Sequence, residues 1–119
     1  MKKVFHLGNC STCQRIIVDL SLESKGFEMR EIKSVPMTIE EVEAMCALAG
    51  SYESLFSKRA MKYRSMGLNE ITLSEEEFKK YILEEYTFLK RPVILSDDQI
   101  FIGSAIKTVD AAKAYLSGL

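Results

Sequence analysis

The stretch VFHLGNCSTC, residues 4–13, decides the fold because it joins a short apolar strand to the start of an amphipathic helix. Its two cysteines, Cys10 and Cys13, lie between the predicted strand and the predicted helix. A Cys-x-x-Cys pair in that position is typical of a redox-active dithiol. We expect Cys10 at the first helical position, where unpaired backbone N–H groups and the positive end of the helix dipole stabilise a thiolate, the nucleophilic form of cysteine. Cys13, one helical turn further on, is then close enough to resolve a mixed disulfide formed at Cys10.

A zinc site is the alternative use of a Cys-x-x-Cys pair. Structural zinc takes four ligands, and only Cys46 and His6 remain as further candidates. Neither belongs to a second closely spaced pair, so we expect no metal at Cys10 and Cys13. Cys46 falls on the apolar face of an expected helix, which favours a buried, unreactive thiol.

Composition places the chain among ordinary globular proteins. Its 119 residues, 47% hydrophobic and 28% charged, suffice for one domain with its own core. The formal net charge of −1 supplies no basic field, which argues against direct binding of nucleic acid. No apolar run approaches the roughly 20 residues of a membrane span, and the first residues do not resemble a signal peptide. Three cysteines without a disulfide framework suit a reducing compartment, so we expect a cytoplasmic protein without membrane contact.

The first third of the chain predicts a strand, a helix and a second strand. Residues 2–7 form the first apolar run, and residues 11–25 form an amphipathic helix that Gly26 is expected to end. Residues 27–32 alternate in part and are expected to form the second strand. Because a helical crossover separates the two strands, we expect them to pair in parallel.

The middle of the chain, residues 38–86, is predicted to be mostly helical. The patterns Thr38-x-x-Glu41 and Ser74-x-x-Glu77 are capping boxes that begin two helices. Between them, residues 51–68 predict a further helical stretch with a basic segment. The basic residues are Lys58, Arg59, Lys62 and Arg64. Such a run is usually a solvated surface, but one arginine could be directed at an anion.

The end of the chain returns to β structure. Residues 93–95 and 100–102 are short apolar runs, and the polar residues 96–99 between them predict a hairpin with a four-residue turn. Gly103 precedes a last amphipathic helix. The resulting order, β-α-β, then helices, then β-β-α, predicts an α/β fold with a mixed sheet.

This order of elements, with Cys-x-x-Cys after the first strand and a proline before the third, resembles the thioredoxin-like (glutaredoxin-like) arrangement. Residues 5–10, the basic segment around Arg59, and the stretch LKRPVI at 89–94 together resemble the arsenate reductase (ArsC)/Spx family. In that family a helical subdomain is inserted into a thioredoxin-like core. The resemblance therefore implies one domain over residues 1–119, with its core at 1–36 and 88–119 and a helical insertion at about 37–87.

The resemblance also implies roles for single residues. Cys10 matches the nucleophilic cysteine, and Arg91 matches an oxyanion-binding arginine beside the proline. Pro92 matches the proline that is cis in thioredoxin-like folds and faces the active thiol. Arg59 matches the arginine of the inserted region in the Spx-like branch. His6 matches a histidine that precedes the nucleophile in arsenate reductases.

For His6 and the two arginines, plainer roles compete with these. His6 would stabilise a thiolate only as a protonated ring turned toward the sulfur, and a histidine at a strand end is otherwise a packed or hydrogen-bonded residue. Without the resemblance, Arg91 would look the same as a solvated surface charge, and the resemblance favours the functional role. Arg59 is favoured only slightly, because Arg64 and Lys58 compete for its role.

Two departures separate this sequence from the arsenate reductases proper. They carry a further arginine near the end of the hairpin, where this chain has Gly103, and their nucleophile lacks a partner three residues on, where this chain has Cys13. An oxyanion such as arsenate needs several charged donors, so the loss of one and the gain of a second thiol favour thiol–disulfide chemistry. Both features are similar to the Spx-like branch.

Three functions follow from the resemblance. The first is a thiol-dependent oxidoreductase acting on a small-molecule or protein disulfide or an oxyanion, with no bound cofactor and with glutathione or a thioredoxin- or glutaredoxin-type protein as reductant. The second is a redox-sensing transcriptional regulator of the Spx type, which binds RNA polymerase. The third is a glutathione- or glutaredoxin-dependent arsenate reductase.

Overall fold

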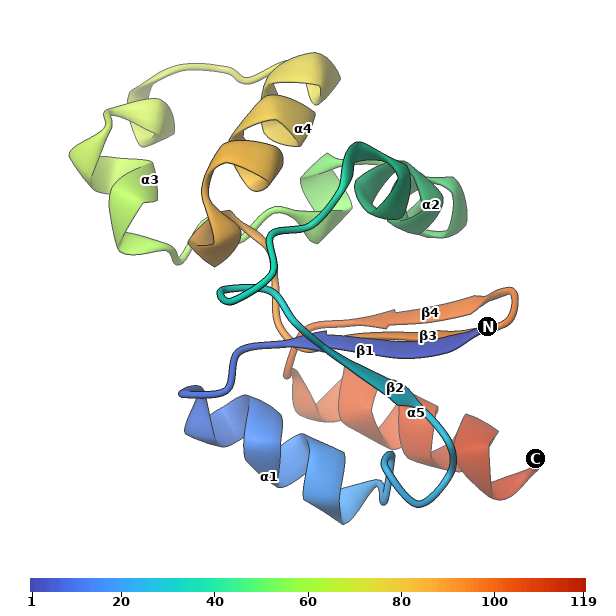
Figure 1. The fold of residues 1–119 in the computed structure, drawn as a ribbon. Helices are drawn as coiled ribbons and strands as arrows, with labels where there is room; N and C mark the ends of the chain where they lie inside the picture. The colour runs from blue at the N-terminus through green and yellow to red at the C-terminus, as the bar shows by residue number, and fades with distance from the viewer. The chain divides into compact units, whose positions relative to one another are not determined.

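The structure is a computed structural model that describes residues 1–119 and divides them into two compact units. The core unit consists of Met1–Val35 and Arg91–Leu119, and the helical unit consists of Pro36–Lys90. The chain leaves the core unit once and returns to it once, so the helical unit is a single insertion (Figure 1).

The core unit is built on a four-stranded mixed sheet with the strand order β2-β1-β3-β4. Its strands are β1 (Lys2–His6), β2 (Glu28–Glu31), β3 (Val93–Ser96) and β4 (Gln99–Ile102). β1 and β2 pair in parallel, while β3 runs antiparallel to both β1 and β4. The mixed sheet, the parallel first pair and the β-β-α ending predicted from the sequence are therefore confirmed.

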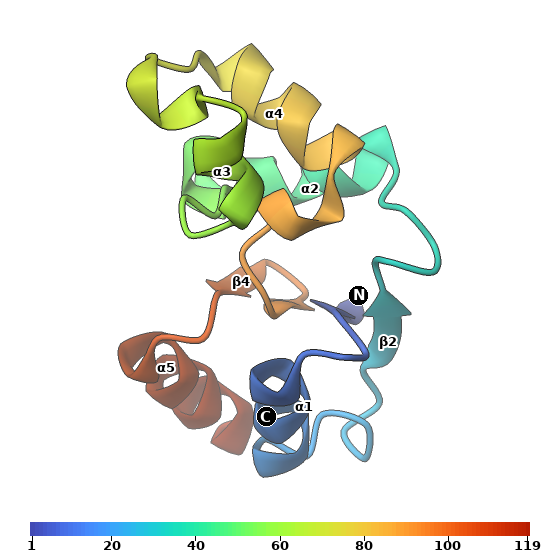
Figure 2. The same cartoon turned by 90° about the vertical axis from the view of Figure 1, so that its left-hand side faces the viewer.

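Two helices, α1 (Ser11–Asp19) and α5 (Ile106–Ser117), cover one face of this sheet, as Figures 1 and 2 show. From the strands, β1 contributes Val4 and β3 contributes Ile94, which are paired neighbours in the sheet. The buried cluster consists of Val4, Ile16, Ile17, Leu20, Leu22, Phe27, Ile94, Ala112 and Leu116. This layer fixes α1, and with it the Cys-x-x-Cys pair, against the end of β1.

The first helix is shorter than the sequence predicts, because it ends at Leu20 rather than at Gly26. Ser21 adopts a left-handed conformation with φ of 54°, and the Leu22 N–H donates to the Ile17 carbonyl at 3.1 Å. This is a Schellman ending, in which an apolar residue after the turn packs back on the helix. Burial of Leu22 in the core therefore ends the helix before the glycine is reached.

The hairpin turn is also tighter than expected. Ser96 and Gln99 pair with each other, so the turn has two residues, Asp97 and Asp98, instead of four. Asp97 has φ of 56°, a conformation that aspartate tolerates better than most residues.

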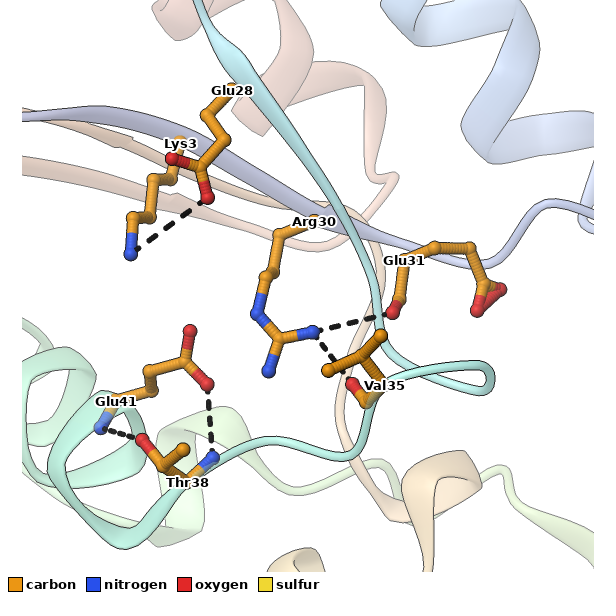
Figure 3. Close-up of polar contacts among 7 residues, drawn as sticks. All are labelled: Lys3, Glu28, Arg30, Glu31, Val35, Thr38 and Glu41. Atoms are coloured by element: carbon orange, nitrogen blue, oxygen red, sulfur yellow. Dashed lines mark hydrogen bonds and ion pairs between the residues drawn. The ribbon is translucent and has the colours of Figure 1, made fainter.

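The helical unit contains α2 (Ile39–Ala49), α3 (Met61–Ser65) and α4 (Glu75–Glu84), together with three short 3₁₀ segments. The 3₁₀ segments are η1 (Glu53–Leu55), η2 (Leu68–Glu70) and η3 (Tyr86–Phe88). Both predicted capping boxes are present, and Figure 3 shows the reciprocal hydrogen bonds of Thr38 and Glu41 at the start of α2. Gly50 ends α2 in a left-handed conformation, as expected.

The prediction of one helical stretch over residues 51–68 is wrong. Phe56 is extended and forms an antiparallel bridge with Leu89, flanked by hydrogen bonds from Ser57 N to Phe88 O at 2.7 Å and from Lys90 N to Leu55 O at 2.8 Å. In these two bonds the Ser57 N–H and the Leu55 carbonyl pair with residues 88 and 90, so they are not available for the hydrogen bonds of a continuous helix. The Phe56 ring then packs on Phe88, with ring centroids 4.9 Å apart, which explains why the break is favourable.

Cys46 lies on α2 and is half-buried rather than fully buried. Its thiol shares a hydrogen bond with Tyr52, and burial raises its pKa above the usual value. A raised pKa favours the protonated thiol, so low reactivity of Cys46 stays a prediction, whereas the expected burial holds only in part.

No helix of the structure has the length and apolar character needed to cross a bilayer.

Candidate active site around Cys10

Cys10 is the N-cap of α1, one residue before the first helical position that the sequence suggested. Its backbone is extended, with φ of −95° and ψ of 105°, and its Sγ accepts a hydrogen bond from the Cys13 N–H at 3.5 Å. A sulfur here takes the place of the side-chain oxygen that usually caps a helix. The cysteine is half-exposed, so the sulfur combines access to solvent with a helix N-terminus.

The two thiols have opposite pKa shifts. Burial opposes ionisation of Cys10, but hydrogen bonds from the Cys13 backbone and thiol, the charge of Arg91 and the Thr12 N–H together lower its pKa below the usual value. Cys13 has no exposed surface, and this burial, with its bond to Cys10, raises its pKa to about 12. The reduced site therefore pairs a thiolate-forming cysteine with a protonated one that donates to it.

Arg91 and Pro92 directly precede β3, and the Arg91–Pro92 peptide bond is cis, as the resemblance implied. The next residue, Val93, pairs with Phe5 near the carboxyl end of β1. Since β1 leads directly to Cys10, this pairing brings the Arg-Pro dipeptide to the same end of the sheet as the thiols. The charge of Arg91 contributes to the lowered pKa of Cys10 and opposes, without reversing, the rise in the pKa of Cys13.

Gly103 follows β4 and donates its N–H to the Pro92 carbonyl at 2.9 Å. Its φ of 90° lies in the left-handed region, where a side chain is strained. Gly103, the position at which the sequence departs from the arsenate reductases, thus has a backbone conformation that favours glycine.

His6 is buried, and its contacts fit a neutral ring. Its Nδ1 faces the Gln14 side-chain amide at 3.1 Å, and the same Gln14 nitrogen donates to the Leu7 carbonyl at 2.9 Å. Because that nitrogen is the donor, Nδ1 accepts, and the ring proton belongs on Nε2, which is buried without a hydrogen-bond partner. The interactions that lower the pKa of Cys10 come from Cys13, Arg91 and Thr12 rather than from His6.

Arg59 belongs to the helical unit, in the segment between η1 and α3, and its side chain is exposed. Its assignment to the site stays a prediction. The other candidate residues, namely Cys10, Cys13, Arg91, Pro92 and His6, all belong to the core unit. Across the 119 residues, no three His, Cys, Asp or Glu side chains converge in a way that could hold a metal ion.

Two residues near the site escaped sequence analysis. Gln14 fixes both the His6 ring and the Leu7 carbonyl, and Glu31 accepts the Gly8 N–H at 3.2 Å. Gln14 directly follows the Cys-x-x-Cys pair, which was a usable signal. No local pattern indicates a role for Glu31, because Gly8 lies 23 residues earlier in the chain, in the loop after β1.

In a comparison with protein families, the model described as the ArsC family matches residues 5–112. The chain belongs to the ArsC family. The matched range begins in β1 and ends in α5, so it takes in the thiols, the helical unit and the Arg91–Pro92 dipeptide.

Curated relatives of this ArsC-family chain include transcriptional regulators. The global transcriptional regulator Spx 2 of Bacillus anthracis is 27% identical over 105 residues, which cover 87% of this chain and 79% of the relative. The global transcriptional regulator Spx of Streptococcus agalactiae is 25% identical over 104 residues, covering 87% of this chain and 76% of the relative.

Solved structures show the same fold. An arsenate reductase from Vibrio cholerae superposes with a TM-score of 0.78 at 15% identity, covering 92% of this chain and 95% of that one. A Staphylococcus aureus COL protein gives a TM-score of 0.72 at 27% identity, covering 93% of this chain and 97% of that one. The α/β, thioredoxin-like fold with a helical insertion is thereby confirmed.

Proposed function

We propose that this ArsC-family chain is a thiol-dependent oxidoreductase in which Cys10 is the nucleophile and Cys13 the resolving thiol. The observation that carries the proposal is the opposite shift of the two pKa values, lowered for half-exposed Cys10 and raised for buried Cys13. A thiol–disulfide exchange needs this asymmetry, because one sulfur must attack from solvent while the other stays protonated until its turn.

The reaction runs in two exchanges. The Cys10 thiolate attacks one sulfur of a substrate disulfide, forms a mixed disulfide with it and releases the other sulfur as a thiolate. Cys13 then loses its proton and attacks the Cys10 sulfur, which releases the second substrate thiol and leaves a Cys10–Cys13 disulfide. The substrate gains two electrons and the protein loses two, which an external thiol reductant returns.

The site favours the second exchange once the first has occurred. The charge of Cys10 and its hydrogen bond contribute to the raised pKa of Cys13. Both effects vanish when Cys10 becomes part of a mixed disulfide. The pKa of Cys13 then falls, and the resolving thiol becomes more nucleophilic at the moment it is needed.

Arg91 supports binding of an anionic substrate, because its charge acts at the two sulfurs and its guanidinium suits carboxylates and oxyanions. Pro92 would shape the surface beside the thiols, and Arg59 would be a second anion contact. An arsenate substrate is less well supported, since Gly103 supplies no side chain. An arsenate assay with glutathione tests that alternative directly.

The reductant in this proposal is glutathione or a thioredoxin- or glutaredoxin-type protein. A reducing compartment such as the cytoplasm is part of this proposal, because a Cys-x-x-Cys dithiol without a disulfide framework suits such a compartment.

Trapping with oxidised glutathione tests the mechanism. The Cys13→Ser protein is expected to accumulate a mixed disulfide between Cys10 and glutathione, detected by mass spectrometry, because the resolving thiol is absent. The unsubstituted protein is expected to pass on to the Cys10–Cys13 disulfide. The Cys10→Ser protein should form neither product, and Cys46→Ser serves as the matched control. Full reductase turnover by Cys10→Ser would refute the proposal.

A redox-sensing regulator of the Spx type is the second candidate, and the similarity to curated Spx proteins favours it. In that case the same dithiol would be a sensor, and the disulfide form would bind RNA polymerase. A pull-down of RNA polymerase with the oxidised but not the reduced chain would support this function. Disulfide reduction without such binding would support the enzyme.

A further inference from the structure

The loop that presents Cys10 is tied to the neighbouring strand by one carboxylate. Glu31 Oε2 accepts the Gly8 N–H at 3.2 Å, and Glu31 Oε1 accepts the N–H groups of Lys33 at 2.7 Å and Ser34 at 2.8 Å. One side chain thus joins the turn after β2 to the loop after β1. Figure 3 shows the Glu31 carboxylate on the opposite side of β2 from the Arg30 guanidinium.

The same loop is held from the α1 side at the adjacent peptide. The Leu7 carbonyl accepts hydrogen bonds from the Cys10 N–H at 3.2 Å and from the Gln14 side chain at 2.9 Å. Gly8 follows Leu7 directly, so the Leu7–Gly8 peptide is bound on both sides. Only Asn9 then separates this peptide from Cys10, which leaves little freedom in where the sulfur lies.

We propose that Glu31 is a positioning residue for Cys10: by holding the Gly8 N–H it keeps the Cys10 sulfur in N-cap contact with the Cys13 N–H. This inference rests on the proposed role of Cys10 as the nucleophile. Glu31 touches neither sulfur and acts only through the backbone of the loop.

The carboxylate is charged whenever Cys10 titrates. Hydrogen bonds from the N–H groups of Ser34, Gly8 and Lys33 lower the pKa of Glu31 below its usual value, although burial opposes this shift. The anchor is therefore present through the neutral and alkaline range in which a thiolate forms.

Glu31→Gln separates positioning from electrostatics, because the two predict opposite changes. The amide keeps one oxygen for the Lys33 and Ser34 N–H groups and turns an NH₂ group toward Gly8. Loss of a negative charge near a thiol lowers the pKa of that thiol, whereas a displaced N-cap raises it. Positioning thus predicts a rise in the pKa of Cys10 despite the lost charge.

The assay is the rate of Cys10 alkylation by iodoacetamide as a function of pH, in a Cys46→Ala background, with Glu28→Gln as the control on the same strand. For Glu31→Gln we expect the midpoint to move up, so that the rate below the midpoint falls about threefold to tenfold, equivalent to about half to one pH unit. Glu28→Gln, whose carboxylate lies 4.0 Å from Lys3, should leave the midpoint unchanged. An unchanged or lowered midpoint for Glu31→Gln overturns the inference.

A second measurement needs no substitution at Glu31. In the unsubstituted protein, the amide proton of Gly8 should titrate by NMR together with those of Lys33 and Ser34, at one midpoint below the usual carboxyl value. A Gly8 amide that does not follow this titration would also overturn the inference. If Cys10 of the unsubstituted protein has an ordinary thiol pKa, the proposed function fails instead, and the two failures are distinguishable.

Discussion

Replacement of Cys13 by alanine is expected to abolish a loss of stability that the reduced protein undergoes at alkaline pH. Cys13 is fully buried, and burial with its bond to Cys10 raises its pKa to about 12, against 9.0 for an ordinary thiol. Above pH 9 the unfolded chain gives up this proton while the folded chain keeps it. The stability that Cys13 contributes is therefore complete below pH 9 and decreases as the pH rises toward 12.

The size of this loss of stability can be worked out from the single proton of Cys13 that the folded chain keeps and the unfolded chain releases. A difference of one bound proton between the folded and unfolded states changes the free energy of unfolding by about 1.4 kcal/mol per pH unit. Between pH 9 and pH 10.5 the reduced protein should thus lose up to about 2 kcal/mol that Cys13→Ala does not lose. At neutral pH the variant starts lower by about 1 kcal/mol, because the deleted sulfur leaves a small cavity.

Cys10 has the opposite pH dependence and does not obscure this result. Its pKa is lowered, so its contribution is present above the ordinary thiol pKa and disappears as the pH falls. That change lies below pH 9, outside the range in which Cys13 titrates. Cys13→Ala also changes the surroundings of Cys10. Above pH 9, however, the pH dependence of the free energy of unfolding differs between the two proteins only because the variant lacks the Cys13 proton.

Urea unfolding followed by circular dichroism, with a phosphine reductant present, measures the difference at pH 8, 9, 10 and 10.5. Cys46→Ala is the matched control, since its half-exposed thiol should give a weaker dependence. The oxidised protein, measured without the reductant, has neither of these two thiols free to ionise and should behave like Cys13→Ala above pH 9. A constant free-energy difference between Cys13→Ala and the unsubstituted protein over this range would refute the reasoning.

Three further substitutions test other parts of the structure. Arg91→Met removes the positive charge that acts on Cys10. At pH values below the midpoint of the pH–rate profile, alkylation of Cys10 should therefore slow about threefold to tenfold. An unchanged profile would contradict the role of Arg91. Thr38→Ala removes the capping box with Glu41 and should cost about 1 kcal/mol in urea unfolding, whereas a neutral effect would mean that the cap contributes nothing. Gly103→Ala places a side chain at φ of 90° and should cost about 1–2 kcal/mol by the same assay; equal stability would show that the backbone relaxes there.

Local signals in the sequence predicted much of the fold. The capping boxes at Thr38 and Ser74 begin α2 and α4 because each depends only on residues three positions apart. The Cys-x-x-Cys pair at the end of an apolar strand located α1 and the thiols in the same way. The cis Arg91–Pro92 bond, by contrast, was implied only by the resemblance to thioredoxin-like folds and not by a local signal.

Predictions failed where contacts between distant residues decided the backbone. The helical stretch over residues 51–68 is broken because Phe56 pairs with Leu89, a partner no local pattern reveals. α1 ends at Leu20 because Leu22 is needed in the core, although Gly26 offered a stronger local stop signal.

The chemistry of the site divides in the same way. The sequence by itself determined that Cys10 and Cys13 lie one helical turn apart at a helix start, because a short motif fixes that geometry. Only the tertiary structure decided that one thiol has a lowered pKa and the other a raised one. That difference comes mainly from burial of Cys13 and from the hydrogen bond between the thiols, while the charge of Arg91, which lies just before β3, helps to lower the pKa of Cys10. A pKa depends on such surroundings in space rather than on neighbours in sequence.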